Sequence, residues 1–308
     1  MVPTAVFTLH SWNSTENGSS IENEEWLAFL QRNMEELMAG QLDCLKNTNL
    51  VSVVIAPLRN YNASPKVLEY VANMLALPFV VTGPSEKEVE NIEEVYLEAK
   101  VLPNLIYASK IIARNKNCPS RSTTPSAFGE GDMQYQSVSE LSSDELQALE
   151  AICLLICYLV HCNEDFLIQF CDAVAILNAV TLLQQFLLLG RRKLRVVTDY
   201  LAIFNLILQQ LPENADLVEQ IILGTSTGDN PVDLSILLTH PSSVVRFRTC
   251  ELIRQLTSVK QNTQLTTLSP KLEQNLNLLL SDSSNSVHMA AEEVLQHLKK
   301  LTIPKHSE

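Results

Sequence analysis

The feature that most constrains the fold is an internal repeat in the last third of the chain. The segments 237–253 and 278–295 align at a constant offset of 42 residues, with Leu237 opposite Leu279, so that Val245 and Arg246 fall opposite Val287 and His288. Each copy contains an apolar run, a polar turn and a second run with apolar residues at helical spacing. Because a helix with one apolar face must bury that face on a neighbour, repeated pairs of such helices are expected to stack.

The period of 42 residues lies within the roughly 40–47 residues typical of HEAT and armadillo repeats, whose paired helices stack into an α-solenoid. We therefore predict an all-α fold, an armadillo/HEAT-like α-solenoid in two helical segments. The composition agrees with this prediction, because 46% of the residues are hydrophobic but only 6% are aromatic. Such a balance suits helices that pack through aliphatic side chains.

Local composition divides the chain into five parts. They are a disordered leader at 1–20, an N-terminal helical segment at 21–117, a flexible Ser/Thr/Pro-rich linker at 118–142, a HEAT/armadillo-like repeat domain at 143–301 and a tail at 302–308. Within the helical parts we expect helices at 23–40, 65–77, 86–98, 103–115, 164–189, 195–211 and 213–223, and a buried, kinked helix at 50–60. Another helix should begin at Ser142, which forms a capping box with Glu145.

Net charge and targeting signals limit the partners and the compartment. Lys and Arg number 22 against 35 Asp and Glu, a net charge of −13, and such a surface repels nucleic acid and anionic lipid. No apolar run approaches the ~20 residues that span a bilayer, and the first residues lack the pattern of a signal peptide. The cysteines number seven, an odd count that suits free thiols in a reducing compartment. We predict a cytoplasmic protein with protein partners.

Signatures of catalysis are missing from the sequence. Eight glycines in 308 residues leave little material for a phosphate-binding loop. The chain also lacks the Gly-x-Gly-x-x-Gly, His-Arg-Asp and Asp-Phe-Gly motifs with which protein kinases bind ATP and magnesium. We therefore predict that the chain is not an enzyme and uses no cofactor. The alternatives are an unusual active site or a chain that completes a kinase in trans.

A possible metal site lies on one helix. Cys153, Cys157 and His161 stand at i, i+4 and i+8, and soft ligands on one face could hold zinc or copper. The same stripe coincides with the apolar face of the helix, where cysteines act as small hydrophobic residues. We favour the core interpretation and predict no bound metal.

Basic residues could form the polar part of a docking surface. The residues concerned are Arg191, Arg192, Lys193, Arg195, Arg246 and Arg248. An acidic surface of a protein partner could bind them. Alternatively, the first four interact with free carbonyl groups at a helix end, and Arg246 and Arg248 form structural hydrogen bonds to an adjacent turn.

The linker contains candidate phosphorylation sites at Ser120, Ser122, Thr123 and Thr124. They surround Arg121, and Pro125 follows the last of them. Added phosphate would change the charge of this segment strongly. Clusters of Ser and Thr are also common in ordinary linkers.

Five blocks of sequence carry a family resemblance. They are IENEEWLAFL (21–30), NLVSVVIAPLRN (49–60), VLPNLIYASKII (101–112), FLIQFCDAVAIL (166–177) and LPENADLVEQII (211–222). In these blocks the chain resembles the C-terminal regulatory region of the Fused family, insect serine/threonine kinases of Hedgehog signalling. In that family the kinase domain lies N-terminal to this region, so the resemblance implies that it is absent here.

The resemblance also implies a role and partners. It implies a regulatory and scaffolding region that docks the kinesin-like protein Costal and Suppressor of fused, and that acts on the kinase domain of the full-length relative. None of the matched positions belongs to a kinase motif, so no catalytic residue is carried over. Two alternatives remain: a fragment of an ATP-dependent protein serine/threonine kinase, and a general HEAT-repeat adaptor.

Overall fold

The computed structural model describes residues 16–39, 42–80, 84–114, 140–223, 234–260, 265 and 270–302. These residues form an all-α protein, as predicted, with no β-strand among them. The α-helices are α1 (Glu16–Met38), α2 (Thr48–Val54), α3 (Pro65–Val80), α4 (Glu86–Glu98), α5 (Val101–Ala113), α6 (Ser143–Cys162), α7 (Glu164–Ile176), α8 (Val180–Leu187), α9 (Leu194–Gln210), α10 (Ala215–Leu223), α11 (Leu234–Leu238), α12 (Ser243–Val259), α13 (Pro270–Leu279) and α14 (Asn285–Thr302). Short 3₁₀ turns join them, among them η2 (Ala56–Arg59) and η4 (Leu188–Arg191).

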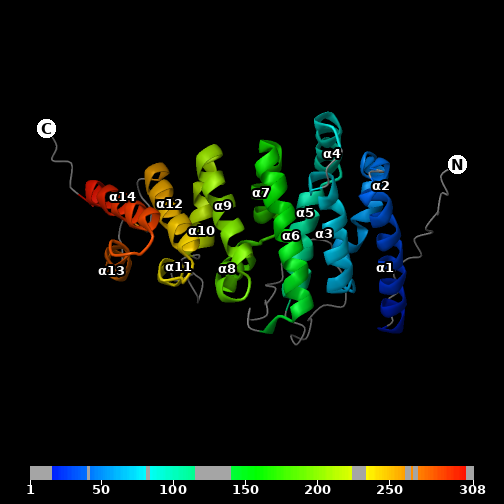
Figure 1. Ribbon diagram of the computed structural model, residues 1–308, viewed down its shortest axis with the longest axis horizontal. Helices are drawn as coiled ribbons and strands as arrows, with labels where there is room; N and C mark the ends of the chain where they lie inside the picture. The colour runs from blue at the N-terminus through cyan, green and yellow to red at the C-terminus, as the bar shows by residue number, and fades with distance from the viewer. Residues whose placement is uncertain are drawn as a thin grey trace.

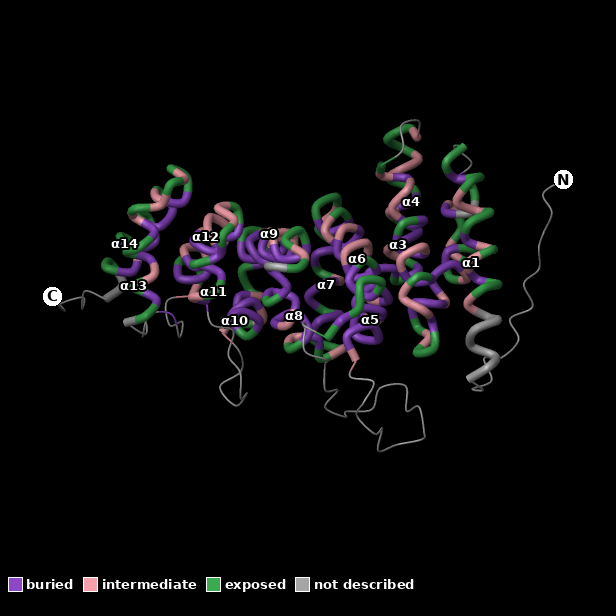
Figure 2. Tube along the Cα trace, turned by 60° about the horizontal axis from the view of Figure 1, so that its bottom comes forward, coloured by how far each residue is buried: buried purple, intermediate pink, exposed green. Residues whose placement is uncertain are grey.

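The helices follow one another along the long axis of the molecule, with α1 at one end and α14 at the other (Figure 1). One series of contacts joins α1 to α3, α3 to α6, α6 to α9, α9 to α12 and α12 to α14. A second series joins α5 to α7, α8 to α10 and α11 to α13. Buried faces line the interior along the whole row (Figure 2), and they form one continuous hydrophobic core. Because α3 packs on α6, the helices before and after the predicted linker share that core.

Helix α1 begins earlier than the sequence predicts. It starts at Glu16, inside the segment 1–20 that we expected to be disordered. Once Trp26 and Leu30 are buried against the core, adding helical residues upstream costs little, because propagation needs no new nucleus. Residues 1–15 of the predicted leader, 118–139 of the predicted linker and 303–308 of the predicted tail lie outside the described residues.

Two prolines act differently from the prediction. The expected helix at 50–60 is divided, because α2 ends at Val54 and the 3₁₀ turn η2 begins at Ala56. Pro57 has no N–H to continue the α-helical ladder. Pro78, by contrast, does not end α3, which continues to Val80 with the proline ring buried.

The expected helix at 164–189 is broken into two. α7 ends at Ile176, α8 begins at Val180, and their axes differ by 107°. Asn178 occupies the left-handed region with φ 51°. The N–H of Ala179 donates to the Val174 carbonyl at 2.9 Å and that of Asn178 to the Ala175 carbonyl at 3.2 Å. This is a Schellman motif, with asparagine in the position that glycine usually takes.

Side-chain hydrogen bonds fix the ends of two helices near the centre of the molecule. The predicted capping box of α6 is confirmed, with the Ser142 N–H donating to Glu145 Oε2 at 2.8 Å and the Glu145 N–H to Ser142 Oγ at 3.2 Å. Lys110 of α5 donates from its ammonium to the Leu177 carbonyl at the end of α7.

The expectation that no apolar run approaches the length of a bilayer span was wrong. α6 is long and apolar enough to cross a membrane, although 56% of its most apolar stretch is buried inside this protein. That burial is typical of a core helix.

Candidate docking surface

Arg246 joins the two sequence repeats. Its guanidinium donates to both carboxylate oxygens of Asp282, at 2.7 and 2.9 Å, from the start of α12 to the turn before α14. It also donates to the carbonyls of His240 at 2.6 Å and Pro241 at 2.9 Å. The hydrogen bond from Arg246 lowers the pKa of Asp282 below its usual value. Arg246 thus has the structural role that was one of our two alternatives.

The basic run before α9 is mostly occupied by contacts within the chain. Arg192 donates to the Leu141 carbonyl at 2.9 Å, and the Lys193 ammonium pairs with Glu150 of α6. Both contacts hold the junction of η4 and α9 against the N-terminal half of α6 and the residue Leu141 that precedes it. Arg191 is the last residue of η4, and its side chain lies outside the described part of the chain.

The side chains of Arg195, on α9, and Arg248, on α12, both lie near Asp199 of α9. The Arg195 side chain is 59% exposed, and its Nε lies 3.6 Å from Oδ2 of Asp199 one turn along the helix. Arg248 of α12 donates to the carbonyl of Thr198, the residue before that aspartate. Burial raises the pKa of Asp199, although the two guanidinium groups act in the opposite direction.

Asn205 keeps α12 in place beside this point. Its Nδ2 donates to the carbonyls of Leu201 at 3.0 Å and of Arg248 at 3.2 Å. The amide is buried and holds the backbone of α12 against α9. Val244, one turn before Arg248 on α12 and therefore its neighbour on the helix surface, is 47% exposed. The surface around Arg248 therefore combines a cationic and an aliphatic group.

The three residues of the possible metal site do not form one. The His161 imidazole is hydrogen bonded through Nδ1 to the Cys157 carbonyl at 2.6 Å, and the Cys153 thiol contacts the Val196 carbonyl at 3.9 Å. Burial raises the pKa of Cys157 to about 12 and raises that of Cys153 as well. No cluster of three metal ligands occurs among the residues with described structure.

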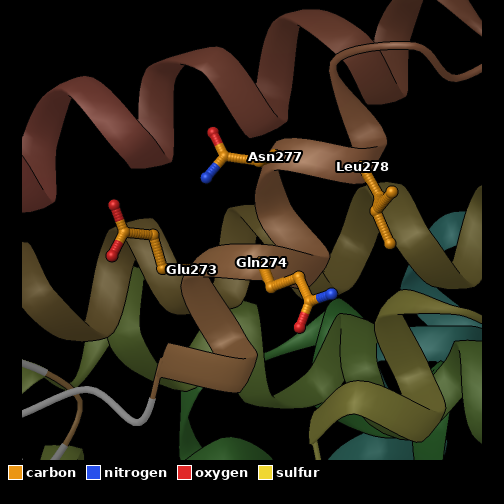
Figure 3. A pocket seen from close by; sticks show the side chains of 4 residues that line it. All are labelled: Glu273, Gln274, Asn277 and Leu278. Atoms are coloured by element: carbon orange, nitrogen blue, oxygen red, sulfur yellow. The ribbon is translucent and has the colours of Figure 1, made fainter.

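One surface hollow was not predicted from the sequence. It has a volume of about 430 Å³ and is lined by Glu273, Gln274, Asn277 and Leu278. All four side chains project from α13 (Figure 3). Leu278 is 63% exposed, and Ile236, which lies opposite it at the offset of the repeat, is 49% exposed.

The four predicted phosphorylation sites, Ser120, Ser122, Thr123 and Thr124, lie outside the described residues.

Comparison with known proteins finds a sequence relative. The chain is 41% identical over 260 residues to the serine/threonine-protein kinase Fused of Drosophila melanogaster. The match covers 80% of this chain and 32% of the relative, so the chain spans about a third of the relative's length. No family model and no solved structure matches the chain.

The relationship corrects one prediction. We expected from the missing motifs that the chain is not an enzyme, and the match to a protein named as a serine/threonine kinase contradicts that expectation. The missing motifs describe only the residues of this sequence. The match covers about a third of the relative, so the activity of that whole protein is not carried over to this chain.

Proposed function

We propose that this Fused-related chain is the regulatory and scaffolding part of a serine/threonine kinase, built as an armadillo/HEAT-like α-solenoid. The observation that carries the proposal is the arrangement of the helices in a row, in which α3, α6, α9 and α12 each pack on the preceding and the following helix of one continuous series, while α5 with α7, α8 with α10 and α11 with α13 form separate pairs. α12 and α14 begin at Ser243 and Asn285, which are 42 residues apart, in agreement with the sequence repeat. Stacked pairs of helices offer extended surfaces to partners.

The proposed partners are proteins of Hedgehog signalling in the cytoplasm. The family resemblance implies the kinesin-like protein Costal, Suppressor of fused and the kinase domain of the full-length relative. The surface around Arg195 and Arg248 is our proposed contact for one of them. A localised positive charge on a chain of net charge −13 would orient a partner during encounter, because complementary charges steer association.

A pull-down tests this function. The chain would be incubated with purified Costal and purified Suppressor of fused, and we expect it to retain at least one of them. A variant with Arg195→Glu and Arg248→Glu should lose that binding, whereas Lys87→Glu, a charge reversal at an exposed residue of α4, should not. Circular dichroism of each variant controls for folding. If the folded native chain retains neither partner, the proposed function is wrong.

A further inference from the structure

Arg195 and Arg248 have hydrogen-bond donors that the protein does not use. Arg195 is paired with Asp199 through Nε at 3.6 Å, and Arg248 donates from Nη1 to the Thr198 carbonyl. A guanidinium has five N–H donors in a fixed plane. The described residues provide no other hydrogen-bond partner for either group, and the Arg195 side chain is 59% exposed, so its unused donors can bind a molecule outside the chain. Arg248 is only partly buried, and its remaining donors can contribute beside Arg195.

The local charge determines which anion fits. Two arginines and one aspartate give this point a net charge of +1. A carboxylate carries one negative charge and accepts two parallel hydrogen bonds from an arginine. A phosphate group carries about −1.5 to −2 at neutral pH, and the half-buried Asp199 carboxylate would repel it more strongly. The charge balance therefore favours a carboxylate over a phosphate.

We propose that Arg195 and Arg248 anchor a glutamate- or aspartate-containing segment of a partner protein, in competition with the side chain of Asp199. The proposal rests on the docking function above and specifies the chemistry of the segment that docks. Val244, exposed one turn before Arg248 on α12, provides apolar contact beside the charged groups. When the segment binds, its carboxylate takes the position opposite the guanidinium groups, and Asp199 is the internal group that it displaces.

Fluorescence anisotropy with labelled ten-residue peptides tests the inference on the full chain. The probes are alternating Glu-Ala, phosphoserine-Ala and Lys-Ala peptides, at about 50 mM salt so that screening is weak. We expect the Glu-Ala peptide to bind most tightly. Arg195→Gln should weaken its binding several-fold, and adding Arg248→Gln should weaken it about tenfold or more. Lys87→Gln removes a charge from α4 and should leave the affinity unchanged.

Asp199→Asn is the most informative variant. It removes the competing carboxylate and should raise the affinity for the Glu-Ala peptide about three-fold or more, because the local charge rises from +1 to +2. If Asp199 instead bound a basic partner, the same variant would weaken binding of the Lys-Ala peptide. Because Arg195 is largely exposed, its single variant should keep the thermal midpoint of the native chain even if Arg248→Gln perturbs folding.

Several results would overturn the inference. They are no binding of the Glu-Ala peptide to the native chain, tighter binding of the phosphoserine peptide, and weaker binding of the Glu-Ala peptide by Asp199→Asn. The pull-down separates this inference from the proposed function. If Costal or Suppressor of fused binds the native chain and the double variant equally, the docking function holds and this anchor is wrong. If neither binds but the Glu-Ala peptide does, the anchor holds and those partners are wrong.

Discussion

Gly190 permits a close contact that no other residue would allow. A Cβ at this position would lie 2.8 Å from Nε2 of His240, a buried ring. The ring cannot turn away easily, because its Nδ1 accepts the N–H of Ser242 at 3.0 Å. We expect Gly190→Ala to lower the free energy of unfolding by about 1–3 kcal/mol, the usual cost of overpacking. Urea denaturation measures it.

A double-mutant cycle assigns the cause of that loss. In a His240→Ala background the ring is gone, so Gly190→Ala should cost much less than in the native chain. Equal costs in both backgrounds would show that the glycine is needed for another reason.

Glu88 should contribute to stability in a pH-dependent way. The hydrogen bond from Lys46 at 2.8 Å lowers the pKa of Glu88 to about 2, with further hydrogen bonds from Ser85. An unfolded glutamate titrates near ~4.3. The contribution is therefore complete above the unfolded pKa and disappears as the pH falls through about 2. Glu88→Gln, which keeps an acceptor for the capping box, should melt below the native chain at pH 7.

The pH series provides the check on this prediction. The difference in melting temperature between Glu88→Gln and the native chain should shrink from pH 5 downwards and vanish in strong acid. A difference that stays constant over this range would show that the ion pair with Lys46 does not act on stability.

At the scale of elements, the break between α7 and α8 depends on the backbone of Asn178. Its φ of 51° is accessible to asparagine and glycine but strained for a β-branched residue. Asn178→Gly should leave stability almost unchanged, whereas Asn178→Val should cost about 1–2 kcal/mol. Thermal unfolding of both variants measures this, and equal midpoints would mean that the left-handed conformation is not required.

Helix ends were predictable where a local chemical signal marks them. The capping box at Ser142 and Glu145 was found from the sequence because both partners lie within one turn. The break at Asn178 was missed because the apolar pattern continues through it without glycine or proline. Pro78 was expected to end α3, but the ring is buried in a helix that continues. These outcomes depend on tertiary packing, which outweighs local preference.

The docking surface shows a similar limit. Four of its predicted basic residues are close in sequence, and we treated them as one patch. In the structure, Lys193 pairs with Glu150, Arg195 with Asp199, and Arg246 with Asp282. Arg195 pairs one turn away on its own helix, but the partners of Arg192, Lys193 and Arg246 lie 51, 43 and 36 residues away in the sequence. The spacing of the basic residues does not contain that information.

For the whole molecule, the ion pair of Arg246 and Asp282 should decide whether α13 and α14 stay attached. Both side chains are largely buried, 13% and 7% exposed. Removing one partner of such a pair costs about 3–5 kcal/mol, so Arg246→Leu should release the last helix pair locally. Hydrogen exchange should show lost protection in α13 and α14 while α6 stays protected, because stacked units depend only on their neighbours.

Arg246→Lys is the matched control, because it keeps the charge but not the two parallel hydrogen bonds. It should cost less than Arg246→Leu. Uniform loss of protection along the chain would contradict the prediction, since it would mean that the row of helices unfolds as one unit.

The stacking order also bears on how the chain acquires its structure during synthesis. The contacts that join successive helices connect residues close in sequence, such as Lys193 to Glu150, 43 residues apart, and Lys260 to Glu219, 41 apart. Closing such short loops costs little entropy, and chains dominated by short-range contacts fold rapidly. Each new helix can therefore pack as soon as it leaves the ribosome. The nascent chain can therefore bury its aliphatic side chains before its C-terminus has been synthesised. Once buried, these side chains are no longer accessible to chaperones.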